Sequence, residues 1–296
     1  MITRSSLISQ TTKTLDKAGF DYFEYDGCFD IFARKDNMFF LKILLNVDSF
    51  QEEQSENLKT LSRNTEAKTV VVGHRTRYEN LDDDIIYERF GVPTVTPHTL
   101  ERILFNDIPL FYRGRGGLFA VINPEKLREA RKNANISQSI LADKVGVSKK
   151  CIYEHEANKK PALLDIVEKI EKVLDTDIKD MLELPDFAGD FITSPKNEFE
   201  KIIGQTLNEI GFETDFVDKT PFNVIAKEKV VITTNAENNK KTIEKNIPFI
   251  KNFTDLFNKH ALIITDSAEE YPIPSLTRDE ISDMTSHQVV RKARKR

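Results

Sequence analysis

The feature that most constrains this 296-residue chain is a series of three short helix signatures in its middle. They are preceded by Asn123, Ser137 and Ser148, whose side chains can each cap the N-terminus of a helix. Gly146 ends the second helix, because glycine readily adopts the left-handed conformation that closes a helix. Only Val147 and the capping serine separate this helix from the third. The pattern therefore predicts two short helices joined by a tight turn, which is the helix-turn-helix arrangement.

Apolar residues in these segments recur at helical spacing, which indicates one buried face for each helix. The side chains expected to be buried are those of Leu127, Ala130, Ala134, Leu141, Ala142, Val145 and Val147. The third helix is expected from Lys149 to about Ala157, and turn formers follow from Asn158 to Pro161. A fourth helix is expected from Leu163 to Leu174.

Charge is unevenly distributed along the chain. The whole sequence has a formal net charge of −5, whereas the stretch from Asn123 to Ala162 holds nine basic and five acidic residues. Because phosphate contacts supply much of the affinity for DNA, an acidic chain favours nucleic acid only where its basic residues gather. The middle of the chain is therefore its expected nucleic-acid-binding part.

This central stretch resembles the helix-turn-helix domain of the Cro and phage-repressor family. The resemblance is carried by Leu127 to Lys132, Ser137, Gln138, Leu141, Ala142, Val145 to Ser148, Ile152, Glu156 and the fourth helix. It implies binding of double-stranded DNA with the third helix in the major groove. It also implies an ion pair between Arg131 and Glu156 that ties the first helix to the third. His155 departs from the family pattern, which usually has Ile, Leu or a larger aromatic residue there.

The expected DNA contacts lie on the third helix and beside it. Base readout is assigned to the residues on the exposed face of this helix, Lys149, Lys150, Tyr153 and Glu154. Phosphate contact is assigned to residues at helix starts and in the following loop, Gln138, Ser148, Asn158, Lys159 and Lys160.

Each of these residues also has a simpler interpretation. Lys149 and Lys150 could form only a solvated face, and Tyr153 could simply cover the edge of the domain. His155 is expected to fill the core, because it stands at an apolar position. Cys151 is expected to be a small half-buried residue, with redox sensing as the less favoured alternative.

The sequences on either side of the central stretch repeat each other. The matching blocks are Leu15–Asp21 with Leu207–Glu213, Phe29–Ala33 with Phe222–Ala226, Ala67–Gly73 with Lys259–Thr265, and Val92–Thr96 with Ile273–Thr277. Four blocks that keep their order and spacing indicate an internal duplication. The first copy is expected to contain helices at 7–18 and 50–64 and strands at 20–25, 29–34, 38–45 and 69–73.

This order of elements resembles the core of the restriction-endonuclease-like superfamily. Active members place an aspartate on one strand and a Glu-x-Lys motif on the next, so that two carboxylates hold Mg²⁺. Asp30 and Lys42 fit this pattern, but Phe40 stands where the second carboxylate is needed. The first module is therefore expected to be catalytically inactive.

The second module lacks the pattern as well, since Asn223 replaces the aspartate and the next strand has neither a carboxylate nor a lysine. In the first module, Glu52 or Glu53 of the following helix could supply the missing second carboxylate instead, which is a less favoured alternative. Both modules are expected to serve folding, dimerisation or additional DNA contact.

The expected architecture is multidomain, with two α/β modules of the restriction-endonuclease-like type flanking an all-α helix-turn-helix domain. The modules are expected at 1–116 and 185–290, the helical domain at 117–184 and a basic tail at 291–296. This arrangement resembles a family of archaeal helix-turn-helix transcriptional regulators, on the stretches Gly73 to Thr76, Tyr112 to Phe119 and Gly146 to Ser148.

The sequence predicts a non-enzymatic, sequence-specific transcriptional regulator that binds double-stranded DNA as a homodimer. The alternatives are a Mg²⁺-dependent nuclease targeted by the helix-turn-helix and a protein-interaction scaffold. Cys28 and Cys151 lack neighbouring ligands at metal-site spacing, so neither a metal nor another cofactor is expected. The absence of a long apolar run favours the cytoplasm over a membrane. The basic end from Arg291 is expected to be a mobile tail that contacts phosphates without reading sequence.

Overall fold

The computed structural model describes residues 2–107, 111–182, 184, 193–228, 230–257 and 259–294. The chain divides into two compact units. Unit 1 comprises Val72–Leu184 with the short segments Met1–Thr3 and Leu45–Asp48. Unit 2 comprises Arg4–Leu44, Ser49–Val71 and Pro185–Arg296. The first nuclease-like module therefore contributes to both units, and most of it folds together with the second module.

The first module contains the elements that its sequence predicts. They are α1 (Arg4–Ala18), β1 (Asp21–Glu24), β2 (Ile31–Arg34), β3 (Met38–Asn46), the 3-10 turn η1 (Val47–Ser49), α2 (Glu52–Thr65) and β4 (Lys68–Arg75). β1, β2 and β3 form an antiparallel meander. Gln51 caps α2 through a reciprocal capping box with Gln54.

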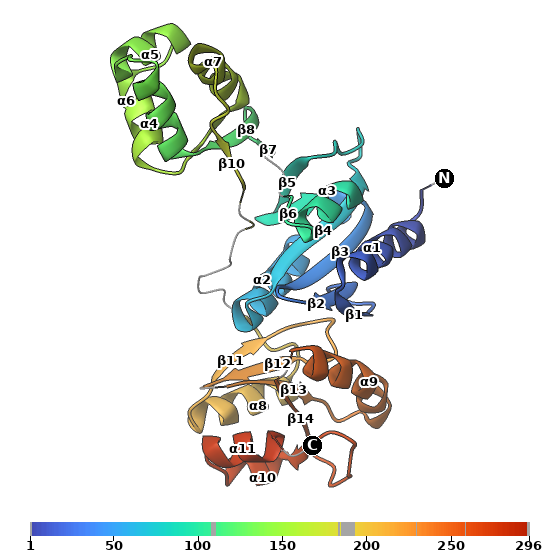
Figure 1. Cartoon of the computed structure of the whole chain (residues 1–296). Helices are drawn as coiled ribbons and strands as arrows, with labels where there is room; N and C mark the ends of the chain where they lie inside the picture. The colour runs from blue at the N-terminus through green and yellow to red at the C-terminus, as the bar shows by residue number, and fades with distance from the viewer. Residues whose placement is uncertain are drawn as a thin grey trace. The chain divides into compact units, whose positions relative to one another are not determined.

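The second module repeats this order. Its elements are α8 (Glu198–Glu209), β11 (Glu213–Phe216), β12 (Val224–Lys227), β13 (Val231–Ala236), α9 (Lys240–Phe257), β14 (His260–Thr265), β15 (Ser275–Thr277), α10 (Arg278–Ser282) and α11 (Ser286–Ala293). The strands lie in the order β11-β12-β13-β14-β15, and β13, β14 and β15 are parallel to one another (Figure 1).

The registers of the two modules confirm the duplication. Ile31 pairs with Leu41 in the first module, and Val224 pairs with Thr234 at the equivalent place in the second. The remaining pairs of β2 with β3 and of β12 with β13 follow in the same order. Because a slip of one residue would turn every side chain to the other face, the shared register shows that both modules bury the same strand faces.

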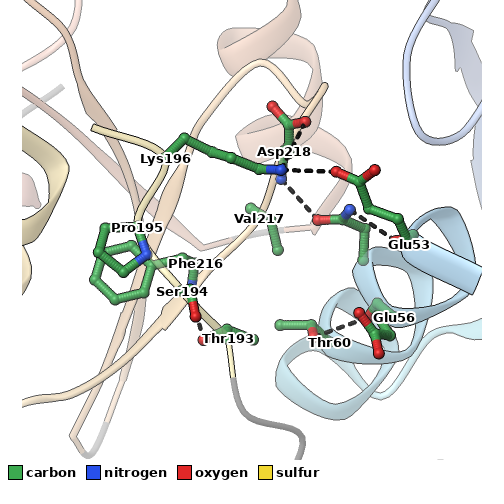
Figure 2. Close-up of a pocket in the computed structure, with 11 residues that line it drawn as sticks. Glu53, Glu56, Thr60, Thr193, Ser194, Pro195, Lys196, Phe216, Val217 and Asp218 are labelled. Atoms are coloured by element: carbon green, nitrogen blue, oxygen red, sulfur yellow. Dashed lines mark hydrogen bonds and ion pairs between the residues drawn. The ribbon is translucent and has the colours of Figure 1, made fainter.

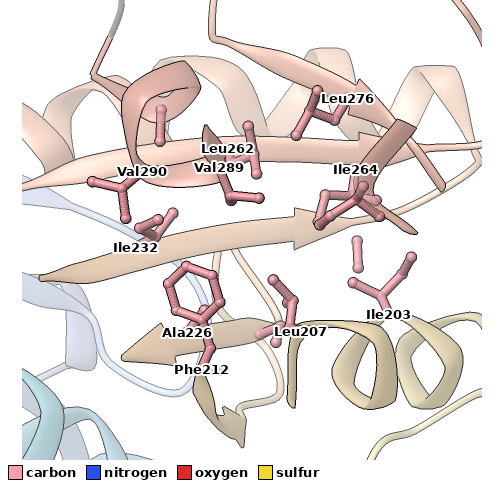
Figure 3. Close-up of a cluster of buried hydrophobic side chains, with 14 residues drawn as sticks. Ile203, Leu207, Phe212, Ala226, Ile232, Leu262, Ile264, Leu276, Val289 and Val290 are labelled. Atoms are coloured by element: carbon pink, nitrogen blue, oxygen red, sulfur yellow. The ribbon is translucent and has the colours of Figure 1, made fainter. Parts of the chain in front are cut away.

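A buried cluster fills the space between the sheet and helices of the second module (Figure 3). Ile203 and Leu207 come from α8, Ile232 and Leu262 from the strands, and Val289 from α11, and each is almost completely buried. Removing such side chains from water stabilises the fold by about 1.5–3 kcal/mol each. The second module thus has a hydrophobic core of its own.

Within unit 2, α9 also packs against β1 and β2 of the first module. The centre of this contact is Phe253, whose ring centroid lies 5.1 Å from that of Phe32, 6.2 Å from that of Phe40 and 4.8 Å from that of Phe222. We call these four phenylalanines the aromatic seam. Phe222, Phe32 and Phe40 are fully buried, so the seam joins the two modules as a hydrophobic core would.

Unit 1 carries the helix-turn-helix. Its elements after β4 are β5 (Ile85–Arg89), β6 (Val92–Val95), α3 (Pro97–Leu104), β7 (Phe111–Gly114), β8 (Gly117–Ile122), α4 (Pro124–Asn133), α5 (Gln138–Val145), α6 (Lys149–Ala157), β9 (Pro161–Leu163), α7 (Leu164–Leu174) and β10 (Lys179–Asp180). The sequence predicts all four helices, α4 to α7. It does not predict β9 and β10, which both pair with β8 and so attach the helices to a small sheet.

The basic segment that begins at Arg291 starts within a helix, whereas the sequence predicts a mobile tail. Arg291 and Lys292 lie in the last turns of α11, where Val290 and Ala293 are buried. The expectation of a mobile tail is therefore wrong for the start of this segment, because two small apolar residues anchor it to the core. Lys295 and Arg296 lie outside the described residues.

Within the part of the chain that the structure describes, no helix combines the length and the apolarity that a membrane span requires.

Candidate nucleic-acid interface

The caps that define α4 and α5 have the predicted geometry. Asn123 Oδ1 accepts hydrogen bonds from the backbone N–H groups of Glu125 (3.1 Å) and Lys126 (3.0 Å). Ser137 Oγ accepts the N–H of Ile140 at 3.2 Å. These bonds satisfy backbone donors that would otherwise lack a partner in the first helical turn. Both helix starts are thus fixed by side chains that the sequence identifies.

The turn between α5 and α6 is short and closed by hydrogen bonds. Gly146 has φ +79° and its N–H donates to the carbonyl of Ala142, as does the N–H of Val147. Ser148 Oγ then accepts the N–H of Cys151 at 3.1 Å, which starts α6. A side chain at position 146 would be strained at this positive φ. The turn therefore fixes the direction of α6 relative to α5.

The core of the helical domain matches its prediction except at two positions. Leu127, Leu141 and Ala142 are almost completely buried. Val147 is only half-buried, although it packs against the same cluster. Ala134 is exposed, because α4 ends at Asn133 and Ala134 lies at its C-cap, past the face that packs on the core.

The predicted ion pair between α4 and α6 is present. Arg131 Nε donates to Glu156 Oε1 at 2.5 Å, and Arg131 Nη2 donates to Oε2 at 3.0 Å. Burial by itself would raise the pKa of the Glu156 carboxyl, but hydrogen bonds from Arg131 and Gln138 outweigh it and hold this pKa below its usual value. The pair is therefore charged and bidentate at neutral pH.

Two further side chains join this pair, and sequence reasoning did not assign them this role. Gln138 Nε2 donates to Glu156 Oε2 at 2.8 Å, so its amide is turned toward the ion pair. Arg128 donates to the backbone carbonyl of Glu156 at the end of α6. The sequence feature that could have predicted this contact is the spacing of Arg128 and Arg131, which lie one helical turn apart on the same side of α4.

The residues assigned to base readout lie on the outer face of α6. Lys149 and Lys150 are exposed, and 59% of Tyr153 is accessible. Glu154 is half-buried, with Lys150 Nζ at 3.9 Å and Lys160 Nζ at 3.4 Å from its carboxylate. Lys149, Lys150 and Tyr153 thus face solvent. The carboxylate of Glu154 pairs with both Lys150 and Lys160.

The loop after α6 holds the remaining predicted contacts. Asn158 is the C-cap of α6 and is exposed. Lys159 Nζ lies 3.3 Å from Asp180 Oδ2, at the strand that pairs with β8. Lys160 pairs with Glu154 as described. These ion pairs are at the surface, where such contacts contribute little to stability.

His155 and Cys151 have the structural environments expected of them. His155 is 8% exposed, and burial lowers the pKa of its imidazole, so the ring is neutral at physiological pH. Burial raises the pKa of the half-buried Cys151 thiol, which is the opposite of what a redox-sensing thiolate requires.

In the first module, Asp30 stands at the position of the nuclease aspartate and pairs with two cations. Asp30 is 2% exposed, and its Oδ1 lies 2.6 Å from Arg4 Nη2 and 3.0 Å from Lys42 Nζ. Its Oδ2 accepts the backbone N–H of Ile43 at 2.5 Å. Phe40, where a second carboxylate would stand, is buried in the aromatic seam. The carboxylate of Asp30 is therefore paired with two cations and one backbone N–H group.

The second module keeps two of these hydrogen bonds with asparagine side chains. Asn223 Oδ1 accepts the N–H of Ala236 at 2.8 Å, as Asp30 accepts that of Ile43. Asn235 Nδ2 donates to the carbonyl of Pro221 at 3.0 Å, at the position equivalent to Lys42 in the first module. Asn223 Nδ2 also donates to the buried carboxylate of Glu200 at 2.9 Å, whereas Asp30 pairs with cations at the equivalent position.

Glu53, considered above as a substitute metal ligand, takes part in a different contact (Figure 2). Lys196 Nζ lies 2.7 Å from Glu53 Oε1 and 3.6 Å from Asp218 Oδ2, at a cavity of about 190 Å³ between α2 and the second module. Asn57 Oδ1 accepts the N–H of Asp218 nearby. Glu52 is exposed on the same helix. In unit 2, Glu53 therefore joins the two modules.

Comparison with known proteins places both predicted domain types on this chain. Residues 4–110 match the model of the PD-(D/E)XK superfamily domain, and residues 127–181 match that of the helix-turn-helix. No solved structure matches the chain. The superfamily match covers the first module, and the shared strand register relates the second module to it.

Relatives in several archaea align with most of the chain. A protein of Methanocaldococcus jannaschii named "Putative HTH-type transcriptional regulatory protein" is 30% identical over 299 residues, covering 96% of this chain and 94% of its own. Proteins with the same name in Pyrococcus furiosus and Methanococcus vannielii are 33% and 32% identical, covering 76% and 87% of this chain and 74% and 86% of theirs. The chain belongs to this archaeal family of proteins named as HTH-type transcriptional regulators, with a PD-(D/E)XK superfamily domain at residues 4–110 and a helix-turn-helix at residues 127–181.

Proposed function

We propose that this protein binds double-stranded DNA through α6 and acts as a sequence-specific, non-enzymatic transcriptional regulator. The observation that carries the proposal is the solvent-facing side of α6, where Lys149, Lys150 and Tyr153 project from a helix held by two caps and a buried ion pair. A rigid helix with cationic and aromatic side chains at its start suits the major groove.

The neighbouring residues would position the helix on the DNA backbone. Lys159 and Lys160 lie in the loop after α6, and their surface ion pairs can give way to phosphate oxygens. Ser148 uses its hydroxyl to cap α6, so its contribution to a phosphate would come through the backbone at the helix start. Gln138 would have to leave Glu156 to reach a phosphate, so we expect it to act by supporting the ion pair.

We further propose that the protein acts as a homodimer in the cytoplasm. One recognition helix covers few base pairs, and two copies related by symmetry read two half-sites with greater affinity and a fixed spacing. The aromatic seam already joins the two modules of one chain, so the surface between protomers would be a different one.

A nuclease is the second candidate, because the first module belongs to a nuclease superfamily. Phe40 argues against this activity, since it occupies the position of the second carboxylate, and Arg4 already pairs with the carboxylate of Asp30 at 2.6 Å. A protein-interaction scaffold is the third candidate. The excess of basic residues between Asn123 and Ala162 disfavours it.

The proposed function predicts that replacing Lys149 and Lys150 with alanine weakens binding to a specific site by about 1–3 kcal/mol for each lysine that reads a base. Titration of labelled duplexes by fluorescence anisotropy measures this loss. Glu168→Ala, an exposed change on α7, is the matched control and should leave affinity unchanged. Wild-type affinity of the double variant for specific and random duplexes alike would exclude α6 as the reading helix.

A second prediction concerns catalysis. Plasmid, linear and branched DNA should remain intact when incubated with the protein and Mg²⁺ or Mn²⁺, because no second carboxylate accompanies Asp30 on the adjacent strand. Gel electrophoresis of the products provides the measurement. Cleavage that persists in highly purified protein and disappears in Asp30→Asn or Lys42→Ala protein would establish the nuclease instead.

A further inference from the structure

Unit 2 contains two adjoining cavities of about 360 Å³ each that the mechanism above does not use. The first lies between the ends of β2 and α2 in the first module and the end of β12 in the second. The second is formed by α9, the start of β14, the loop at 272–274 and the end of α11. Lys259 lines both cavities, and we call the two cavities together the basic groove.

Positive charge is in excess along the basic groove. Its cations are Arg34, Arg63, Lys227, Lys251, Lys259 and Arg294, and its acidic residues are Glu66, Glu228 and Asp255. Arg63 is neutralised by Asp215 at 2.6 Å. The guanidinium of Arg34 donates to the backbone carbonyl of Leu256, and no carboxylate among the described residues forms an ion pair with it.

The other four cations of the groove are exposed to solvent. In the described part of the chain, no carboxylate forms an ion pair with Lys227, Lys251, Lys259 or Arg294, and all four side chains are exposed. They come from different elements: the end of β12, the middle of α9, the residue before β14 and the residue after α11. The two cavities therefore carry exposed cations from four separate places in the fold, and the ammonium of Lys259 also lies 5.6 Å from the ring centroid of Phe257.

We propose that the basic groove binds the phosphate backbone of double-stranded DNA, as a second contact surface in addition to α6. A small anionic ligand is usually held by a few buried polar groups that converge on one point. Exposed cations spread over several elements instead suit an extended polyanion, which gains affinity by releasing its condensed counterions. This inference rests on the proposed function, because DNA is the polyanion that α6 would bring to the protein.

The end of α11 borders the basic groove. Arg294 lines the groove and directly follows α11, which carries Arg291 and Lys292 in its last turn. These two cations thus lie within one helical turn of a lining residue. The groove and these cations would add affinity for any sequence, whereas α6 would supply the choice among sequences.

The test uses the full-length chain with Lys227→Glu, Lys251→Glu and Lys259→Glu combined. Its control combines Lys13→Glu, Lys241→Glu and Lys245→Glu, three exposed lysines of unit 2 that line neither cavity and change the charge equally. Affinities for a specific and a random duplex are measured between low and moderate salt concentrations. Circular dichroism verifies that both triple variants are folded.

We expect the groove variant to lose about tenfold or more in affinity for both duplexes, with an unchanged ratio between them. The slope of log affinity against log salt should become shallower by about two to three, since each lost phosphate contact removes about 0.9. The control should remain within about twofold of wild type in affinity.

Three results would overturn the assignment. The first is a groove variant with wild-type affinity and salt slope; if the Lys149→Ala, Lys150→Ala protein still lost specific binding, the proposed function would survive without the groove. The second is calorimetric binding of inorganic phosphate or a nucleotide that the groove variant abolishes while DNA binding is unchanged. Loss of sequence preference by the groove variant, with random-duplex affinity retained, would likewise show that the groove does not act on the backbone alone.

Discussion

Replacing Phe253 with alanine should destabilise unit 2 by about 3–5 kcal/mol, the range found when a buried phenylalanine is truncated. The ring of Phe253 packs against Phe32 and Phe40 of the first module and against Phe222 of the second. Its removal would leave a cavity at the contact between the modules. Denaturant unfolding followed by circular dichroism measures the loss of stability.

The control for this change is Phe105→Ala, because Phe105 is 51% exposed and its truncation opens no cavity. Phe253→Leu should recover part of the stability, since leucine fills more of the space than alanine does. A Phe253→Ala protein as stable as wild type would show that the two modules are not joined through the aromatic seam.

The second large effect is expected in the helical domain. Glu156→Ala should destabilise this domain by about 3–5 kcal/mol, because it leaves the partly buried Arg131 without its carboxylate. It also removes the acceptor of Gln138 and so frees α5 and α6 to move. Glu168→Ala on the exposed side of α7 is the matched control. Thermal unfolding of the two variants, followed by circular dichroism, compares them directly.

The ion pair between Arg131 and Glu156 also predicts how the stability of the helical domain changes with pH. Because the pKa of Glu156 is lowered in the folded protein, its contribution to stability is fully present above the unfolded pKa and is lost as pH falls through the folded value. The Glu156→Ala protein should lose less stability than wild type over this acidic range. Equal losses in the two proteins, or a Glu156→Ala protein as stable as the control, would contradict the role given to the ion pair.

The sequence predicted the parts of this fold that depend on local signals. The caps at Asn123, Ser137 and Ser148 and the glycine at 146 set helix ends through contacts within a few residues. The duplication was visible because matching blocks such as Phe29–Ala33 and Phe222–Ala226 keep their order and spacing along the chain. In both cases the physical cause lies in neighbouring residues or in a repeated pattern.

Contacts between distant segments were not predictable in the same way. The missing carboxylate at Phe40 was apparent from the motif, but its packing on Phe253 depends on how the second module folds back. Gln138 was assigned to phosphate because helix starts favour anions, whereas the structure gives its amide a stronger partner in the buried Glu156. β9 and β10 are too short to show strand periodicity and exist only through pairing with β8.

The central claim is that α6 reads a DNA sequence. Its most direct test is to sequence the duplexes that the purified full-length protein retains from a random pool through repeated rounds of selection. Wild-type protein should enrich one short motif, and the Lys149→Ala, Lys150→Ala protein should lose most of that enrichment while still retaining DNA at low salt. A pool that stays random with wild-type protein, or a motif that both proteins enrich equally, would contradict the account.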